Sequence, residues 1–174
     1  MSADNVLKFK MSSQSNTSFG VQVKRATEDD IPAICAMVNA AYTKYVERIG
    51  RKPAPMTADY GQLLTTHEMY VLHDFSQGAE KDTRVGSIVL EVSGESLHVN
   101  NLVVSPTAQG RGYGRLLMNF ADEVARKRDV KRLKLYTNVK MWENIGLYAR
   151  LGFDEVGRRV EDGFERVYFE KVVT

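Results

Sequence analysis

The residues with the clearest chemical meaning form a glycine-rich turn between an apolar strand and an apolar-periodic helix. The turn, Gln109–Gly114, reads Gln-Gly-Arg-Gly-Tyr-Gly. Glycine lets a backbone approach an anion closely, and the start of a helix offers unpaired N–H groups and a favourable dipole. We therefore expect Gly112, Gly114 and the N–H groups between them to hold a diphosphate, with Arg111 and Arg115 adding positive charge.

Two common phosphate-binding motifs do not fit this turn. The dinucleotide fingerprint needs G-x-G-x-x-G and an acid that closes the next strand, whereas the glycines here fall at 110, 112 and 114 and the strand 133–137 ends without an acid. The P-loop needs Gly-Lys followed by Ser or Thr, but Gly114 precedes Arg115 and Leu116.

The turn does match Q/R-x-x-G-x-G/A, and so resembles the acetyl-CoA signature of the GCN5-related N-acetyltransferase (GNAT) superfamily. Glu143–Phe153 resembles the second GNAT element, a helix that carries Leu-Tyr and ends at Gly-Phe, and Val23–Asp30 resembles the first strand and helix start. The resemblance covers Val21 to Val172 in the family's order and spacing. It implies an α/β (α+β) fold with a mixed central sheet of about seven strands, about four flanking helices, and a splay at the cofactor-binding strand.

The resemblance further implies that acetyl-CoA is the acetyl donor. In this superfamily the pantetheine arm pairs like an extra strand with the strand before the glycine turn, and one backbone amide there polarises the thioester carbonyl. The positions implied to contact the cofactor are Leu102, Val103, Val104, Gln109, Gly110, Arg111, Gly112, Tyr113, Gly114, Arg115 and Asn144.

Tyr148 matches the Tyr of the Leu-Tyr pair and is the expected general acid, because a phenol is protonated at neutral pH and can donate to a thiolate. The alternative is an aromatic packing residue. Asn144 lies one helical turn earlier on the same face, where it contacts the cofactor or solvates that face. Many family members carry Asn seven residues before the Tyr; this chain has Met141 there, flanked by Asn138 and Asn144.

The general base has two candidates. His98 falls where histone-type GNAT enzymes carry a catalytic Glu, and imidazole has a suitable pKa. Glu91, at the end of the preceding strand, is the second candidate, although a carboxylate there is more often simply solvated. A third alternative is that no dedicated base exists and the amine binds already neutral or loses its proton to water.

The resemblance implies that the loop joining the first two helices forms one wall of the acceptor site, and we expect the closing hairpin to form the other. The loop contains two prolines, which stiffen it, and arginines that either grip an anionic acceptor group or are ordinary surface charges. The residues of these two walls are Tyr42, Tyr45, Arg48, Arg51, Pro53, Pro55, Met56 and Tyr60, and Arg158, Arg159, Phe164, Arg166 and Tyr168.

The periodicity predicts one domain, 21–174, behind a flexible tail, 1–20. A first helix follows an N-cap at Thr27 with Asp30 three residues later, and a loop begins at Arg48. In the main helix, Asp122 is expected on the solvated side. The predicted strands are Val21–Arg25, Met69–Phe75, Arg84–Val92, Ser96–Val104, Leu133–Thr137, Phe153–Val160 and Phe164–Val172, and the later helices are Thr57–Thr65, Gly112–Lys127 and Met141–Leu151.

Composition limits the partners and the location. The chain has 174 residues, a formal net charge of +2 and one cysteine, Cys35. The charge argues against nucleic-acid binding, and a single cysteine excludes an internal disulfide or a cysteine-based metal cluster, so no metal is expected. We expect Cys35 to be a small buried apolar residue. Without an apolar run of membrane length or a leader, we expect a cytoplasmic protein that does not act on membranes.

Three functions remain open from the sequence. The first is an acetyl-CoA-dependent N-acetyltransferase for a primary amine on a small molecule, by direct attack in a ternary complex. The second is a protein lysine or N-terminal acetyltransferase, and the third a non-catalytic acyl-CoA sensor. An intact glycine turn and Tyr148 favour the enzymes. The resemblance also allows a homodimer through the sheet edges or the closing hairpin.

Overall fold

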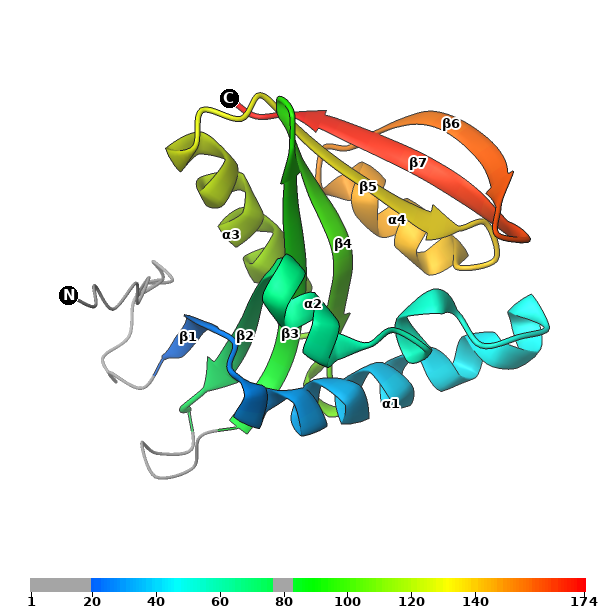
Figure 1. Ribbon diagram of the computed structural model, residues 1–174. Helices are drawn as coiled ribbons and strands as arrows, with labels where there is room; N and C mark the ends of the chain where they lie inside the picture. The colour runs from blue at the N-terminus through cyan, green and yellow to red at the C-terminus, as the bar shows by residue number, and fades with distance from the viewer. Residues whose placement is uncertain (1–19, 77–82) are drawn as a thin grey trace.

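The structure is a computed structural model that describes residues 20–76 and 83–174; the predicted tail at 1–19 and the turn at 77–82 lie outside them. The helices pack around one mixed sheet (Figure 1). The strands are β1 (Val21–Arg25), β2 (Glu68–Asp74), β3 (Thr83–Ser93), β4 (Ser96–Val104), β5 (Arg132–Asn138), β6 (Asp154–Glu161) and β7 (Phe164–Val172). The α-helices are α1 (Ile31–Ile49), α2 (Tyr60–Thr66), α3 (Tyr113–Lys127) and α4 (Trp142–Arg150), and short 3-10 turns cover Glu28–Asp30, Ala54–Met56 and Pro106–Ala108.

The sheet has the strand order β1-β2-β3-β4-β5-β7-β6. Neighbouring strands are antiparallel except for β4 and β5, which run parallel and pair only between Ser96–His98 and Arg132–Lys134. Beyond that short ladder the two strands diverge (Figure 1). This confirms the expected fold class.

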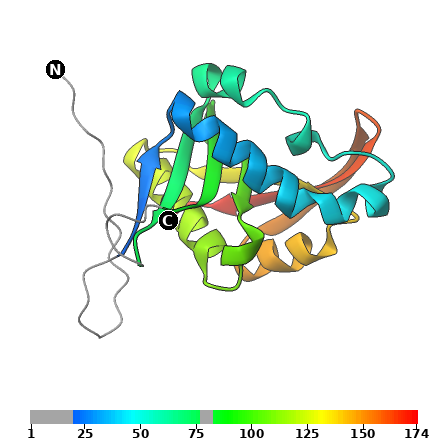
Figure 2. The same ribbon diagram turned by 90° about the horizontal axis from the view of Figure 1, so that it is seen from below.

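The helices cover both faces of the sheet (Figure 2). On one face α1 and α2 pack on Met69, Val71, Val89 and Val103. On the other face α3 packs on the central strands, and Ile145 and Tyr148 of α4 pack against the same core. Because side chains alternate along β4, Val103 belongs to the first core, whereas Leu102 and Val104 contact the second.

A β-bulge separates the paired and the diverging halves of β4. Val89 of β3 lies opposite Asn101, and the next residue, Leu90, lies opposite Val99. Asn100 is therefore the extra residue. A bulge bends its strand and increases the local twist, which accounts for the departure of β4 from β5 immediately after their ladder.

Most predicted elements are confirmed to within a few residues. The N–H of Thr27 donates to Asp30 Oδ2 at 2.8 Å, as expected of the cap. The second helix begins at Tyr60 rather than Thr57, because Asp59 caps it by accepting from the N–H of Gln62 at 3.0 Å. The first helix continues to Ile49, within the predicted loop, and ends at Gly50 in a left-handed conformation with φ of 88°.

The predicted exposure of Asp122 is wrong. The residue is 5% exposed, and its carboxylate accepts a hydrogen bond from Lys171 Nζ at 2.6 Å. The sequence pattern places Asp122 on the polar side of a helical wheel, but β7 supplies a cation over that position, and a paired carboxylate can be buried. Cys35 is only partly buried, packed against the core below α1.

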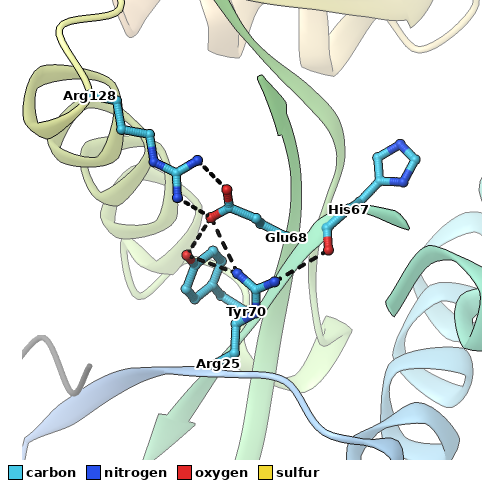
Figure 3. A network of polar contacts seen from close by, with 5 residues as sticks. All are labelled: Arg25, His67, Glu68, Tyr70 and Arg128. Carbon is cyan, nitrogen blue, oxygen red and sulfur yellow. Dashed lines mark hydrogen bonds and ion pairs between the residues drawn. The ribbon is translucent and has the colours of Figure 1, made fainter. Parts of the chain in front are cut away.

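A polar network fastens the C-terminal end of α3 to the first two strands (Figure 3). Arg128, the residue after α3, donates to both carboxylate oxygens of Glu68, to Oε2 at 2.7 Å. The same oxygen accepts from Tyr70 Oη at 2.8 Å and from Arg25 Nη1 at 3.3 Å. Arg25 also donates to the carbonyl of His67 at 3.4 Å, which joins β1 to the start of β2.

No helix in the described part of the chain combines the length and the apolar character needed to cross a membrane.

Candidate functional site

Two cavities adjoin where β4 and β5 separate. The first, here the turn cavity, has a volume of about 620 Å³ and extends from the glycine turn to α4. The second, the tyrosine cavity, has a volume of about 300 Å³ and lies between the Pro53–Tyr60 segment, β4, β5 and β7. Tyr42, Leu102, Asn144 and Tyr148 line both cavities, so a molecule that fills the turn cavity can meet one in the tyrosine cavity at these residues.

The glycine turn forms the open end of the turn cavity. Gly110 and Gly112 have φ of 80° and 82°, which L-residues rarely adopt, and Gly112 directly precedes α3. Apart from the adjoining residues of the turn and the backbone of α3, no described residue has an atom within 4 Å of a Cβ added to Gly110, Gly112 or Gly114. The backbone is therefore bare at the start of α3, where the first N–H groups have no acceptor within the helix, and this fits a bound diphosphate.

Two side-chain hydrogen bonds and one ion pair anchor the turn. Tyr113 Oη donates to Asp74 Oδ2 at 2.7 Å, and Gln109 Nε2 donates to the carbonyl of Val104 at 3.2 Å. Arg111 forms an ion pair with Asp74, with 3.6 Å between Nη1 and Oδ2, and does not line the turn cavity. The cations that line it are Arg115, as predicted, and Lys44 and Arg150, which the sequence analysis missed.

The predicted cofactor-binding segment of β4 lies along the same cavity. Leu102, Val103 and Val104 pair with β3 on one side, opposite Ile88, Ser87 and Gly86. On the other side the ladder to β5 stops at His98. The backbone of Leu102–Val104 is therefore an unpaired strand edge facing the gap, the arrangement that an extended chain needs in order to add a strand.

Tyr148 lies at the junction of the two cavities. Its ring packs edge-on against Phe153 and at 57° to Phe169, with centroids 6.0 and 5.5 Å away. Burial raises the pKa of its phenol to about 12. Within the described residues its hydroxyl makes no hydrogen bond, so the donor is available to a bound molecule.

The amides around Met141 divide between the cavities. Asn144 lines both, and its Nδ2 donates to Thr137 Oγ1 at 3.3 Å. Asn138 lines only the tyrosine cavity, and its Oδ1 accepts from the N–H of Lys140 at 2.9 Å. Met141 itself is 5% exposed and contacts the tyrosine cavity. Of the two asparagines, only Asn144 can therefore reach the turn cavity.

The two candidate bases lie together but outside both cavities. His98 faces Glu91 across β4 and β3, in the paired half of β4 before the bulge. Glu91 Oε2 accepts from Asn100 Nδ2 at 3.1 Å and lies 3.5 Å from His67 Nε2. The structure brings His98 and Glu91 to each other rather than to Tyr148.

A chain of hydrogen bonds forms one wall of the tyrosine cavity. Tyr42 Oη donates to Asn101 Oδ1 at 3.1 Å, Asn101 Nδ2 donates to Tyr60 Oη at 2.9 Å, and Tyr60 donates to the carbonyl of Pro55 at 2.9 Å. Burial raises the pKa of both phenols. The chain ties α1, β4 and the proline-containing loop together. The sequence analysis named Tyr42, Tyr60 and Pro55 but missed Asn101, although an Asn pair inside an apolar strand is a usable signal.

The loop arginines hold the walls together instead of lining the cavity. Arg48 pairs with Glu143 at 2.8 Å and lies over the ring of Trp142, 3.7 Å from its centroid. Arg51 lies 3.5 Å from the ring centroid of Phe164, across the gap to the closing hairpin. Of the residues predicted for the two walls, Tyr42, Pro53, Pro55, Tyr60, Phe164 and Arg166 line the tyrosine cavity.

Comparison with known proteins agrees with this geometry. A sequence model described as "Acetyltransferase (GNAT) domain" matches residues 65–155. An uncharacterized N-acetyltransferase of Methanocaldococcus jannaschii is 38% identical over 61 residues, which are 35% of this chain and 27% of that protein. The chain thus matches about a quarter of that relative's length.

Solved structures share the fold at low sequence identity. A GNAT family acetyltransferase from Elizabethkingia anophelis, solved with acetyl-CoA bound, is similar with a TM-score of 0.66 and 18% identity over 88% of this chain and 98% of that chain. The ribosomal-protein-S18-alanine N-acetyltransferase from Escherichia coli has a TM-score of 0.68 and 19% identity over 88% of this chain and 94% of its own. These structures support the fold alone, whereas the sequence match extends over more than half of the chain and includes the glycine turn. The chain belongs to the GNAT acetyltransferase family.

Proposed function

We propose that this protein is an acetyl-CoA-dependent N-acetyltransferase that acetylates a primary amine on a small molecule, by direct attack in a ternary complex. The observation that carries the proposal is the junction of two cavities at Tyr148. One cavity has a bare glycine turn and an open strand edge, and the other is bounded by tyrosines joined in a chain of hydrogen bonds.

The turn cavity suits acetyl-CoA residue by residue. The N–H groups from Gly112 to Arg115 lie at the start of α3 and bind the diphosphate. Arg115, Lys44 and Arg150 add positive charge along this cavity. The open edge of Leu102–Val104 pairs with the pantetheine arm, which directs the thioester toward Tyr148 and leaves a backbone amide free to polarise its carbonyl.

The transfer requires one proton to reach the leaving group. Acetyl-CoA supplies an activated acyl group; the amine nitrogen forms the new C–N bond, and the thioester C–S bond breaks with its electron pair leaving on sulfur. Tyr148 donates its proton to that sulfur, and the proton lost by the amine balances it, so that an amide and free CoA result. A raised phenol pKa keeps the proton in place until a thiolate develops.

Deprotonation of the amine does not require a carboxylate or an imidazole in the cavity wall as a base. Within the described residues, the lining of the tyrosine cavity includes no Asp, Glu or His. An amine that enters neutral, or that gives its proton to water, satisfies the chemistry. Roles for His98 and Glu91 stay predictions; replacing each by Gln and measuring kcat against pH tests them, because loss of a base removes the corresponding ionisation from the profile.

A protein acceptor is the alternative within the same chemistry. The volume of the tyrosine cavity, about 300 Å³, is at the lower end of the range for small-molecule sites, and this favours a compact acceptor. The sensor alternative conflicts with the unpartnered hydroxyl of Tyr148 at the cavity junction, which a binding module would not need. A cytoplasmic location and a homodimer stay predictions.

Two assays test the proposal. The first measures whether acetyl-CoA raises the melting temperature, because a ligand that binds only the folded state stabilises it. The second measures thiol release with a panel of small amines and with peptides. Stabilisation and turnover on small amines support the proposal. Turnover on peptides alone would replace it with protein acetylation, and stabilisation without turnover on either class would favour the sensor.

A further inference from the structure

The tyrosine cavity has an unusual charge distribution for a site that must receive an amine. Among its lining residues in the described part of the chain, Arg166 is the one charged side chain, and there is no carboxylate. Amines with more than one positive charge need acidic partners when they leave water, because a buried and unpaired charge is costly. The cavity offers a second ammonium group no such partner.

Arg166 further disfavours acceptors that carry more than one positive charge. The residue is 9% exposed and is held by Glu161 at 2.7 Å and Asp162 at 3.3 Å, while its guanidinium carbon lies 4.4 Å from the ring centroid of Tyr136. Glu161 and Asp162 do not line the cavity. These two carboxylates are therefore paired with Arg166, and a cationic acceptor group in the tyrosine cavity would meet the guanidinium side of the pairs.

Apart from Arg166, most of the lining is apolar or aromatic, and the polar residues in it carry no charge: Asn100, Asn101, Thr137, Asn138 and Asn144. Tyr42, Tyr60, Tyr136 and Tyr148 line the cavity together with Phe164, and the aliphatic part is completed by Ile49, Pro53, Pro55, Leu63, Val89, Val99, Leu102 and Met141. Tyr42 and Tyr60 are fixed in the hydrogen-bond chain through Asn101, so their rings form a preorganised surface. Such a surface binds an apolar or aromatic body through area burial and ring contacts.

We propose that the acceptor is a monoamine: one primary amino group attached to a compact, uncharged apolar or aromatic body. This inference rests on the proposed function and narrows it. The transfer itself is unchanged, with the single amino group forming the C–N bond and the CoA sulfur taking the electron pair and a proton. Polyamines and other multiply cationic amines are poor acceptors, because their second charge would be desolvated against Arg166 without a counter-ion.

A matched pair of probes tests the charge requirement. Pentylamine and 1,5-diaminopentane have the same carbon chain and differ in one terminal ammonium group. After correction for the two equivalent amino groups of the diamine, we expect kcat/KM to be at least about tenfold higher for pentylamine. We expect 2-phenylethylamine to exceed pentylamine because of its ring. Equal or better turnover of the diamine would overturn the inference while leaving the proposed acetyltransferase intact.

A variant that introduces a negative charge into the cavity wall gives a second test. Asn101→Asp is isosteric and places a carboxylate in the cavity wall, where the hydroxyl of Tyr42 can still donate to it. The hydroxyl of Tyr60, which now accepts from Asn101 and donates to the carbonyl of Pro55, can turn to donate to the new carboxylate. We expect the ratio of kcat/KM for the diamine over the monoamine to rise about tenfold. Asn119→Asp makes the same chemical change on the exposed side of α3, outside both cavities, and leaves the ratio unchanged. A ratio that does not respond to Asn101→Asp, in a variant that still melts cooperatively, contradicts the inference.

Binding separates failure of the inference from failure of the proposed function. Calorimetry with CoA present measures the affinity of each amine without requiring turnover. Tighter binding of pentylamine than of the diamine supports the charge argument. If acetyl-CoA neither binds nor turns over with any amine, the proposed function fails, and the inference fails with it.

Discussion

The hydroxyl of Tyr113 donates to Asp74 Oδ2 at 2.7 Å and thereby ties the first residue of α3 to the last residue of β2. Asp74 is 6% exposed. Burial alone would raise the pKa of this carboxyl, but hydrogen bonds from Tyr113 and Ser76 and the charge of Arg111 bring the pKa below its ordinary value. The carboxylate is thus ionised at neutral pH and anchors the glycine turn without itself lining the turn cavity.

We expect Tyr113→Phe to weaken acetyl-CoA binding without changing the chemical step. The variant keeps the aromatic ring but removes the hydroxyl that donates to Asp74. The backbone of the glycine turn before α3 is then held less firmly. Loss of a hydrogen bond to a charged group corresponds here to a rise in KM for acetyl-CoA of about 5- to 10-fold, or about 1–1.4 kcal/mol. Steady-state kinetics should show this rise with kcat nearly constant.

Two controls distinguish positioning of the turn from general destabilisation in that variant. Acetyl-pantetheine lacks the diphosphate, so its KM should be the same for wild type and Tyr113→Phe. Tyr70→Phe removes a hydroxyl bonded to a different carboxylate, Glu68, outside both cavities, and should leave both donors unaffected. A parallel rise in KM for the two donors would show that the hydroxyl supports the fold and not the diphosphate site.

Gly112→Ala should bind acetyl-CoA more weakly than the wild type. Its lower folding stability should account for only part of this loss of affinity. With φ of 82°, Gly112 is in the left-handed region, and an L-residue there costs about 1–2 kcal/mol of folding stability. The added Cβ also projects into the open space that we propose for the diphosphate. Thermal melting and isothermal calorimetry with acetyl-CoA measure the two effects.

Gly94→Ala is the matched control for that substitution. Gly94 has φ of 57° in the turn between β3 and β4, and among the described residues only its chain neighbours lie within 4 Å of a Cβ added there. The control should show a similar drop in melting temperature and normal acetyl-CoA affinity. If both variants bind acetyl-CoA normally, the glycine turn is not the diphosphate site.

The order of the elements and the glycine turn could be predicted because both depend on local sequence. Period-2 and helical patterns locate the strands and helices, and Gln109–Gly114 carries its own motif. The splay could not be derived from the residues alone, since it depends on the bulge at Asn100 and on how far β4 pairs with β5. The family resemblance supplied it instead.

Side-chain partners were the least predictable part of the site. The motif predicts that Arg111 contacts the phosphate. In the structure, Arg111 pairs instead with Asp74, which lies 37 positions earlier in the chain. Arg48 and Arg51 are similarly committed to Glu143 and Phe164. Because these partners come together only through the tertiary fold, a sequence pattern can identify a cation but not the group it meets.

Tyr148→Phe should lower kcat by about 10²- to 10⁴-fold, the range expected for loss of a general acid, with little change in the KM for acetyl-CoA. The ring and its contacts with Phe153 and Phe169 remain. With its pKa at about 12, the hydroxyl keeps its proton on the alkaline side, so wild-type kcat should not decline below about pH 10 through its ionisation. An unchanged kcat in Tyr148→Phe, measured beside Tyr70→Phe, would assign Tyr148 to packing.

Glu68→Gln should make folding less stable at neutral pH and less sensitive to acid. Burial acts to raise the pKa of Glu68, but hydrogen bonds from Arg128 and Tyr70 and the charges of Arg128 and Arg25 lower it below the ordinary value of 4.5. The folded state therefore binds this proton less readily than the unfolded chain. The stabilisation is complete above pH 4.5 and is lost as pH falls through the lower folded-state pKa.

Thermal melts between neutral and acidic pH test this linkage. Since Arg25 and Arg128 are partly exposed, solvent screening reduces the effect, and we expect Glu68→Gln to lose about 1 kcal/mol, or about 2–4 °C in Tm, at pH 7. The difference from wild type should shrink as the wild-type carboxylate protonates. Glu95→Gln, in the exposed turn between β3 and β4, should follow the wild-type curve. A Tm difference that stays constant down to acidic pH would show that Glu68 stabilises α3 through its shape and neutral hydrogen bonds rather than through its charge.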